Sequence, residues 1–296
     1  MQLDNTRIAV RERGLLETLD LALQVLREFA APLFYCTVLG VLPLVVLNYA
    51  LLGWMADVDY GEGEFPWRFV WNMSLLVYLE APLAGVLAVS FLGPAVFMER
   101  PTLRQVLSDT LASARQLIWV QLLLRGILPA WLLLLTLGRF EPNIFVEFFL
   151  LPALALYATV LRSLRPYISE IVLLEKNPLR AKKPTDIPVG KRSEHLHGPS
   201  SADLFVRWIC SAAIALLLIL LVGAMLYGIL GILISDWMPN WYKLQFGYPL
   251  VLWLVAGYFS IVRFLNYLDL RIRHEGWEVE LLMRAEAIRI AGKIAP

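Results

Sequence analysis

Long apolar stretches alternate with shorter polar segments along the 296 residues of the chain. A helix rises about 1.5 Å per residue, so about 20 apolar residues cross a hydrocarbon core that is about 30 Å thick. Stretches of this kind lie at residues 33–55, 70–98, 117–137, 143–162, 204–234 and 247–264. The pattern predicts an all-α integral membrane protein with about six transmembrane helices in one polytopic domain, residues 1–296.

Two segments that precede hairpins of these spans have the helical period of an amphipathic helix. In residues 14–32 the apolar positions three and four apart are Leu16, Leu19, Leu23, Leu26 and Ala30. In residues 100–117 they are Leu103, Val106, Leu107, Thr110, Leu111 and Ala114. We expect both segments to lie as surface helices on the inner leaflet. A third unit has only a short segment from Ser200, so a threefold repeat stays open.

Two further polar regions follow the fourth and the last span. Residues 177–201 are rich in Pro, Gly, Ser and basic residues and have no apolar period, so they predict a flexible cytoplasmic loop. Residues 265–291 predict a long C-terminal helix with one continuous apolar face. A second, smaller apolar face of this helix consists of Leu270, Trp277, Leu281 and Ile288. Either a partner protein or a second copy of the chain binds this face, or the monomer itself covers it.

Composition and charge support a membrane protein and give it an orientation. Hydrophobic residues make up 59% of the chain and charged residues 17%, against about 25% charged in soluble domains. Of the 26 Lys and Arg residues, 22 fall on one side of the predicted spans, which places both termini in the cytoplasm. No cleavage site follows the first apolar run, so we expect no removed signal peptide. Cys36 and Cys210 lie in or beside apolar spans, and we assign them neither a disulfide nor a metal.

Ionisable residues within or close to the apolar stretches form the candidate intramembrane site: Glu80, Arg125, Glu147 and Glu170. A charge at the bilayer centre costs about 2.5–3.5 kcal/mol on insertion scales, so such groups usually face the bundle interior and have a partner. Glu80 with Arg125 is the expected pair, unless Arg125 extends to the interface instead. Prolines in the apolar stretches are expected to kink the helices: Pro82, Pro94, Pro129 and Pro152.

The sequence has few residues that could support catalysis or bind a metal. The histidines, His195, His197 and His274, all fall in predicted cytoplasmic segments, and none belongs to a known metal or nucleophile motif. We therefore expect no enzyme activity, no cofactor and no metal site. We expect the lipid bilayer to be the partner of the chain, and we expect it to bind no nucleic acid.

Segments spread over nearly the whole chain resemble one bacterial family. They are "YLDLRIRHEGWEVELLMRAEA" (residues 267–287), "RERGLLETLDLALQVLREFAAPLF" (11–34), "ERPTLRQVLSDTLASARQLI" (99–118) and "PYISEIVLLEKNPL" (166–179). The first is the most specific. Together they are similar to a six-span membrane family whose members include the membrane domain of some glycerophosphodiester phosphodiesterases and many stand-alone proteins. The resemblance implies a helical bundle in the bacterial inner membrane without catalytic residues. The chain departs from the family in its long loop with Pro184, Pro188 and Pro199.

Two functional hypotheses follow from these observations. The first is a non-catalytic accessory or scaffold protein that organises partner proteins at the cytoplasmic membrane through its C-terminal helix. The alternative is a transporter or lipid-handling protein that uses the kinked spans with Glu80, Arg125 and Glu147.

Overall fold

The computed structural model describes residues 12–61, 65–97, 101–137, 143–181, 186–235, 237–238 and 240–275. All regular structure within these ranges is helical. The α-helices are α1 (Leu15–Glu28), α2 (Ala30–Gly61), α3 (Trp67–Ala84), α4 (Val86–Val96), α5 (Leu103–Ala112), α6 (Ala114–Leu117), α7 (Ile127–Leu135), α8 (Leu151–Leu164), α9 (Ile168–Glu170), α10 (Val189–His197), α11 (Ser201–Ile234) and α12 (Tyr248–Glu275). Short π-helical segments are η1 (Ile118–Leu124), η2 (Val146–Leu150), η3 (Ile171–Glu175) and η4 (Lys243–Gly247).

Five helical stretches are long and apolar enough to cross a membrane: Ala30–Asp57, Trp67–Val96, Val146–Leu164, Ser201–Ile234 and Lys243–Glu275. A sixth results if Ala114–Leu124 and Ile127–Leu135, which are bent by 57° at a short break, count as one span. These stretches are consistent with the polytopic membrane protein that the apolar pattern predicts.

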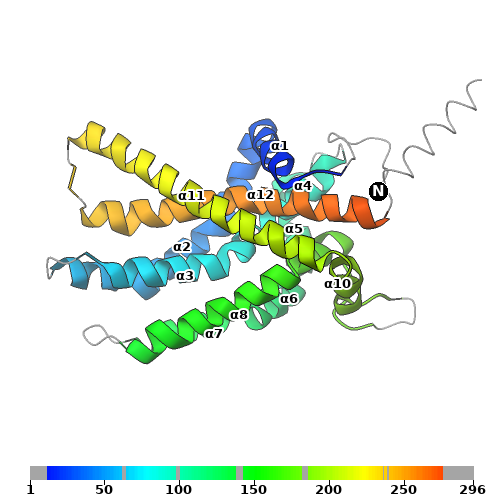
Figure 1. The fold of residues 1–296 in the computed structure, drawn as a ribbon, viewed down its shortest axis with the longest axis horizontal. Helices are drawn as coiled ribbons and strands as arrows, with labels where there is room; N and C mark the ends of the chain where they lie inside the picture. The colour runs from blue at the N-terminus through cyan, green and yellow to red at the C-terminus, as the bar shows by residue number, and fades with distance from the viewer. Residues whose placement is uncertain are drawn as a thin grey trace, which may run out of the picture.

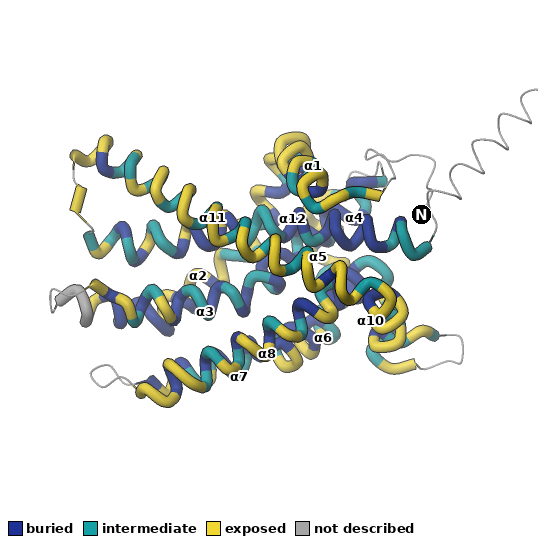
Figure 2. Tube along the Cα trace, viewed as in Figure 1, coloured by how far each residue is buried: buried dark blue, intermediate teal, exposed yellow. Residues whose placement is uncertain are grey.

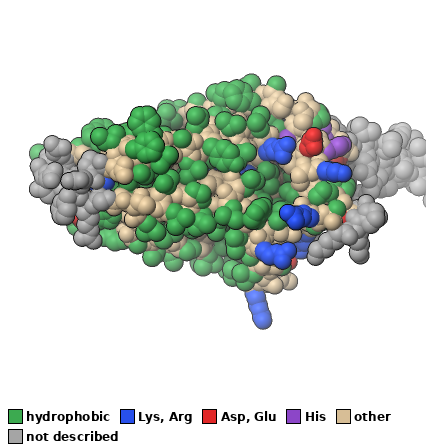
Figure 3. Space-filling model, turned by 90° about the horizontal axis from the view of Figure 1, so that it is seen from below, with side chains coloured by type: hydrophobic (Ala, Val, Ile, Leu, Met, Phe, Trp, Pro, Cys, Tyr) green, Lys and Arg blue, Asp and Glu red, His purple; other side chains and the backbone are tan. Residues whose placement is uncertain are grey.

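The long helices run side by side along the longest dimension of the molecule (Figure 1). We call the end where α10 and the last turns of α12 lie the α10 end; it is on the right in Figure 1. Helix α12 is largely buried, whereas α11 is exposed along most of its length (Figure 2). On the face seen in Figure 3, hydrophobic side chains cover most of the surface, and Lys and Arg side chains gather toward the α10 end. This distribution suits a molecule whose middle lies in lipid.

Both predicted amphipathic segments form helices, α1 and α5, and most leucines of the predicted stripes are exposed. In α1 the buried residues are Thr18, Ala22 and Val25, while Leu16, Leu23 and Leu26 are exposed. In α5 only Val106 is buried, and Leu103, Leu107 and Leu111 are exposed. Figure 1 shows α1 close to end-on, across the long axes of α11 and α12. Exposed leucines on one face are consistent with the predicted surface helices.

The third apolar stretch is not one straight helix. The chain leaves η1 at Arg125 and turns at Gly126, whose φ of +79° is in the left-handed region. The break therefore lies at a glycine, not at Pro129 as expected. Pro129 lies in the first turn of α7, where a missing N–H costs no hydrogen bond. Pro152 lies where η2 passes into α8. Pro82 and Pro94 do lie inside helices.

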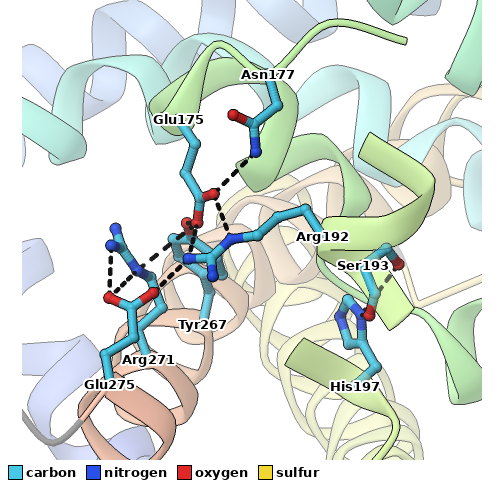
Figure 4. A network of polar contacts seen from close by, with 8 residues as sticks. All are labelled: Glu175, Asn177, Arg192, Ser193, His197, Tyr267, Arg271 and Glu275. Carbon is cyan, nitrogen blue, oxygen red and sulfur yellow. Dashed lines mark hydrogen bonds and ion pairs between the residues drawn. The ribbon is translucent and has the colours of Figure 1, made fainter. Parts of the chain in front are cut away.

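Part of the segment 177–201, which the composition predicts to be a flexible loop, forms a helix. Residues Val189–His197 form α10, and Val189, Ser193, Leu196 and His197 of this helix are buried. Arg192 is bound on both sides: it donates to Glu175 of η3 at 2.6 and 2.9 Å and to Glu275 of α12 (Figure 4). Ion pairs at long sequence separation thus hold α10 in place, although this helix lacks a long apolar period.

Replacing Gly126 with alanine tests the break in the third stretch. We expect Gly126→Ala to lower the free energy of unfolding by at least about 1–2 kcal/mol, because a side chain disfavours the left-handed conformation. The added Cβ would also lie 2.6 Å from Cδ1 of Leu154. The measurement is thermal unfolding in detergent. Gly223→Ala is the matched control: it lies inside α11 with no atom within 4 Å of the added Cβ, and it should stabilise by about 0.5–1 kcal/mol. Unchanged stability of Gly126→Ala would contradict this account.

Candidate functional site: an arginine-lined cavity

A cavity of about 410 Å³ lies between α3, α8, α11 and α12. This volume is within the range of about 300–1,000 Å³ that is usual for small-molecule sites. Its walls are mostly apolar and include Val77, Leu216, Ile219, Leu252 and Phe259. The wall residues Ala212 and Leu216 of α11 are exposed, so the cavity opens onto the apolar surface of the molecule.

Four arginines line the cavity toward the α10 end: Arg125, Arg162, Arg207 and Arg263. They come from four separate parts of the chain, namely the break after η1, the last turn of α8, the first turns of α11 and the second half of α12. Arg125 is 1% exposed and Arg162 is 8% exposed. The site thus combines a basic end with a hydrocarbon-like wall.

Arg162 is held by the helix that Pro82 interrupts. Proline has no N–H, so the carbonyl of Tyr78, four residues earlier, loses its intrahelical donor. Arg162 supplies a replacement: Nη1 donates to the carbonyl oxygen of Tyr78 at 2.5 Å, and Nη2 donates to that of Leu79 at 2.7 Å. Its guanidinium also lies 4.3 Å from the centre of the Tyr78 ring. In an apolar environment such a carbonyl is tolerated only when something nearby satisfies it, and Arg162 does so here.

Arg125 lies where the third stretch breaks. Its backbone N–H donates to the carbonyl of Val120, which closes the π-helical turn, and the chain then bends at Gly126. Its side-chain Nη2 donates to the carbonyl of Pro166 at 3.1 Å. The other terminal nitrogen, Nη1, is buried and has no partner.

The remaining two arginines have carboxylate partners. Nε of Arg263 donates to Glu170 at 2.6 Å, and its buried Nη2 has no partner. Arg207 donates to Asp269 at 3.1 Å and to Asp203 at 2.9 Å. Nη2 of Arg207 also donates to the carbonyl of Arg13, so α11 is tied to the segment before α1.

Three of the arginines that line the cavity therefore each have a buried donor without an acceptor. These donors are Nη1 of Arg125, Nε of Arg162 and Nη2 of Arg263. Buried polar atoms normally have a hydrogen-bond partner, and a buried charge needs one more than a neutral group does. Among the described residues no carboxylate forms an ion pair with Arg125 or Arg162, so an acceptor with negative charge suits this place.

The structure does not bring the four candidate ionisable residues together. Glu80 does not pair with Arg125: it accepts from Asn48 at 2.7 Å and from Trp131 at 2.6 Å, which joins α2, α3 and α7. The expected pair is wrong because Arg125 lies at the break near the α10 end, where its partner is the backbone of Pro166.

The other two candidate carboxylates have different partners from each other. Glu147 is 1% exposed and pairs with Arg68, with the closest oxygen and nitrogen 2.5 Å apart, at the end of the bundle opposite to α10. Asn72 and Trp71 also donate to Glu147. Glu170 pairs with Arg263 and has one oxygen without a partner. Of the four candidates, Arg125 lines the cavity. Glu170 does not line it, but it pairs with Arg263, which does.

Three of the site's arginines are not among the candidate residues that the sequence suggested. They are Arg162, Arg207 and Arg263, and each lies at the end of a span. A signal that could have identified them is local: the sequences "TVLRSL", "LFVRWI" and "SIVRFL" place apolar residues on both sides of each arginine. Such a setting is typical of an arginine embedded in the bundle.

The second apolar face predicted for the C-terminal helix is described only at its first residue. Leu270 is 4% exposed and packs in the hydrophobic cluster at the α10 end, so the monomer covers it. Trp277, Leu281 and Ile288 lie outside the described residues, as does the part of the predicted helix 265–291 after Glu275. In the described part, α12 continues without interruption from the last span to Glu275.

A histidine of α10 is buried beside the cavity. Nε2 of His197 lies 3.4 Å from the backbone N–H of Tyr167, which can only donate, so Nδ1 carries the proton and donates to the carbonyl of Ser193 at 2.7 Å. The rings of Tyr167 and His197 stack, with centres 5.6 Å apart. His197 is therefore a structural contact of α10, and the described residues hold no group of three or more His, Cys, Asp or Glu suited to a metal ion.

Comparison of the chain with protein-family models, with curated proteins and with solved structures gave no match. The resemblance to the six-span family therefore stays a prediction.

The neutral His197 predicts a loss of stability in acid. Burial lowers the pKa of His197 from 6.5 to about 4, and the charge of Arg165 adds to this effect. Between these values the unfolded chain binds a proton that the folded chain does not. Stability is therefore fully present above about pH 6.5 and falls toward pH 4, by up to about 1.4 kcal/mol per pH unit.

Thermal unfolding in detergent from pH 7.5 to pH 4 measures this dependence. We expect the midpoint to fall less steeply with decreasing pH in His197→Gln than in the wild type. His195→Gln, an exposed position on the same helix, is the matched control and should keep the wild-type slope. Equal slopes in His197→Gln and the wild type would contradict the buried neutral ring.

Proposed function

We propose that the chain is a polytopic membrane protein that binds an anionic, lipid-like molecule in the cavity between α3, α8, α11 and α12. In this arrangement the negative headgroup lies among the arginines, and the hydrocarbon part lies along the apolar wall toward Ile219 and Leu252. This is the lipid-handling hypothesis of the sequence analysis with a different set of residues. Arg125 is retained from that hypothesis. Arg162, Arg207 and Arg263 take the place of Glu80 and Glu147.

One observation carries the proposal: an apolar cavity ends in buried guanidinium groups whose free donors have no acceptor. Arginine donates in a fixed planar fork that suits carboxylate and phosphate oxygens. A soluble anion would leave most of the apolar wall without a partner. An amphiphile satisfies both ends of the cavity at once.

The orientation proposed for the protein agrees with this site. We place the protein in a bacterial inner membrane, with the α10 end on the cytoplasmic side, following the distribution of basic residues. The bent pair η1 and α7 is then the sixth span. The headgroup then lies near the inner leaflet, where anionic headgroups are abundant. We assign the chain no catalytic role.

The scaffold hypothesis stays a prediction. It depends on Trp277, Leu281 and Ile288, which lie outside the described residues, and Leu270 of the same face is buried within the monomer. No contact among the described residues favours it over lipid binding.

A bulky side chain in the cavity wall tests the proposal. Ala212→Trp fills the cavity from α11, and Ala213→Trp places the same side chain at an exposed neighbouring position that does not line it. Overfilling a packed site costs about 1–3 kcal/mol, and each 1.4 kcal/mol is tenfold in affinity. We expect the anionic lipid that remains bound after purification, counted by native mass spectrometry, to fall about tenfold in Ala212→Trp only. Equal retention in the two variants would contradict the proposal.

A further inference from the structure

We infer that the cavity selects a headgroup with two negative charges, that is, a phosphate monoester or a diphosphate, over a phosphodiester or a zwitterion. The inference rests on the proposed function and specifies its ligand class. It follows from the number of uncompensated charges at the basic end and from the number of free donors there.

Four guanidinium groups line the cavity, and two of them are balanced. Glu170 pairs with Arg263, with the nearest atoms 2.6 Å apart, and Asp269 pairs with Arg207 at 3.1 Å. Arg125 and Arg162 have no carboxylate partner among the described residues. Arginine stays protonated in proteins, so both charges persist in the bundle.

These two charges are also unfavourably placed with respect to each other. Arg125 lies close enough to Arg263 and Arg162 for their charges to repel, and Glu170 is the carboxylate that opposes this effect. A buried cation without a partner is strongly unfavourable. A ligand with a single charge balances one of the two; a ligand with two charges balances both.

The free donors favour the same headgroup. Nη1 of Arg125, Nε of Arg162 and Nη2 of Arg263 belong to three different segments of the chain, and each has no acceptor. A phosphate monoester presents three terminal oxygens and carries about −1.5 to −2 charge at pH 7. A phosphodiester presents two such oxygens and one charge.

The apolar wall identifies a lipid as the source of the phosphate. Toward the middle of the molecule the cavity is lined by Leu216, Ile219 and Leu252, and the polar contact there, between the hydroxyls of Ser74 and Tyr248, is internal. Free phosphate would occupy the basic end alone.

Headgroup competition on the wild-type protein tests the inference directly. The protein in nanodiscs of phosphatidylcholine is titrated with short-chain phosphatidic acid, with phosphatidylglycerol of the same chains, and with inorganic phosphate, and binding is followed by native mass spectrometry. We expect phosphatidic acid to bind at least about tenfold more tightly than phosphatidylglycerol, as one additional charge-assisted contact implies.

The variant Arg125→Gln removes one uncompensated charge, and we expect it to reduce that preference about tenfold. Arg115→Gln is the matched control, because Arg115 is exposed on α6 and outside the cavity. The wild-type comparison stands even where Arg125→Gln fails to fold.

The outcomes separate this inference from the proposed function. Equal affinity for the two lipids, with loss of both in Ala212→Trp, would overturn the two-charge headgroup and leave lipid binding intact. If inorganic phosphate competes as well as phosphatidic acid, the charge inference is upheld and the lipid is overturned. If no probe binds, both are overturned.

Discussion

The two hydrogen bonds from Arg162 to the carbonyls of Tyr78 and Leu79 are the constraint on which the middle of the bundle depends. Pro82 leaves one of these carbonyls without its helical donor, and an unsatisfied carbonyl is costly away from water. Arg162 satisfies it, and in doing so it joins α8 to α3. The same guanidinium borders the cavity. A single side chain thus repairs the kinked helix and supplies part of the positive charge.

Close contacts around the cavity keep its walls in place. Gly85, between α3 and α4, lies so near α12 that an added Cβ would be 2.3 Å from the hydroxyl of Ser260, a residue of the cavity wall. Tyr78 and Thr159 join α3 to α8 by hydroxyl groups 2.8 Å apart. At the α10 end, Glu175, Arg192, Tyr267, Arg271 and Glu275 form one polar network that fixes α10 and η3 against α12 (Figure 4). The basic end of the cavity therefore lies beside a network that connects its helices.

The helices could be predicted from the sequence because their signals are local. Long apolar runs and the period of residues 14–32 determine where helices form, and the structure has helices there. In α1 the leucines of the predicted apolar face are largely exposed, whereas Thr18, Ala22 and Val25 face the bundle. A helix between lipid and protein can direct leucines to the lipid and small residues such as Ala22 to the bundle. An apolar period alone does not distinguish these two environments.

The sequence could not show which charged side chains pair in the folded structure. Glu80 and Arg125 are the most conspicuous opposite charges in the spans, yet neutral donors from α2 and α7 satisfy Glu80. The arginines of the cavity come from residues 125 to 263, and only the packing of four segments brings them together. Helix α10 was missed for a related reason: Arg192 finds Glu175 and Glu275 on other elements, and composition does not show such partners.

Helix α11 separates the cavity from the surroundings of the bundle, and most of its own surface is exposed. A hydrocarbon chain that moves from the bilayer past this single helix exchanges lipid neighbours for side chains that are equally apolar, so it gains little from the move. Its headgroup alone enters a different environment. For the proposed ligand, the free energy that distinguishes one lipid from another would then be almost entirely electrostatic, and the length or saturation of the chain would matter little.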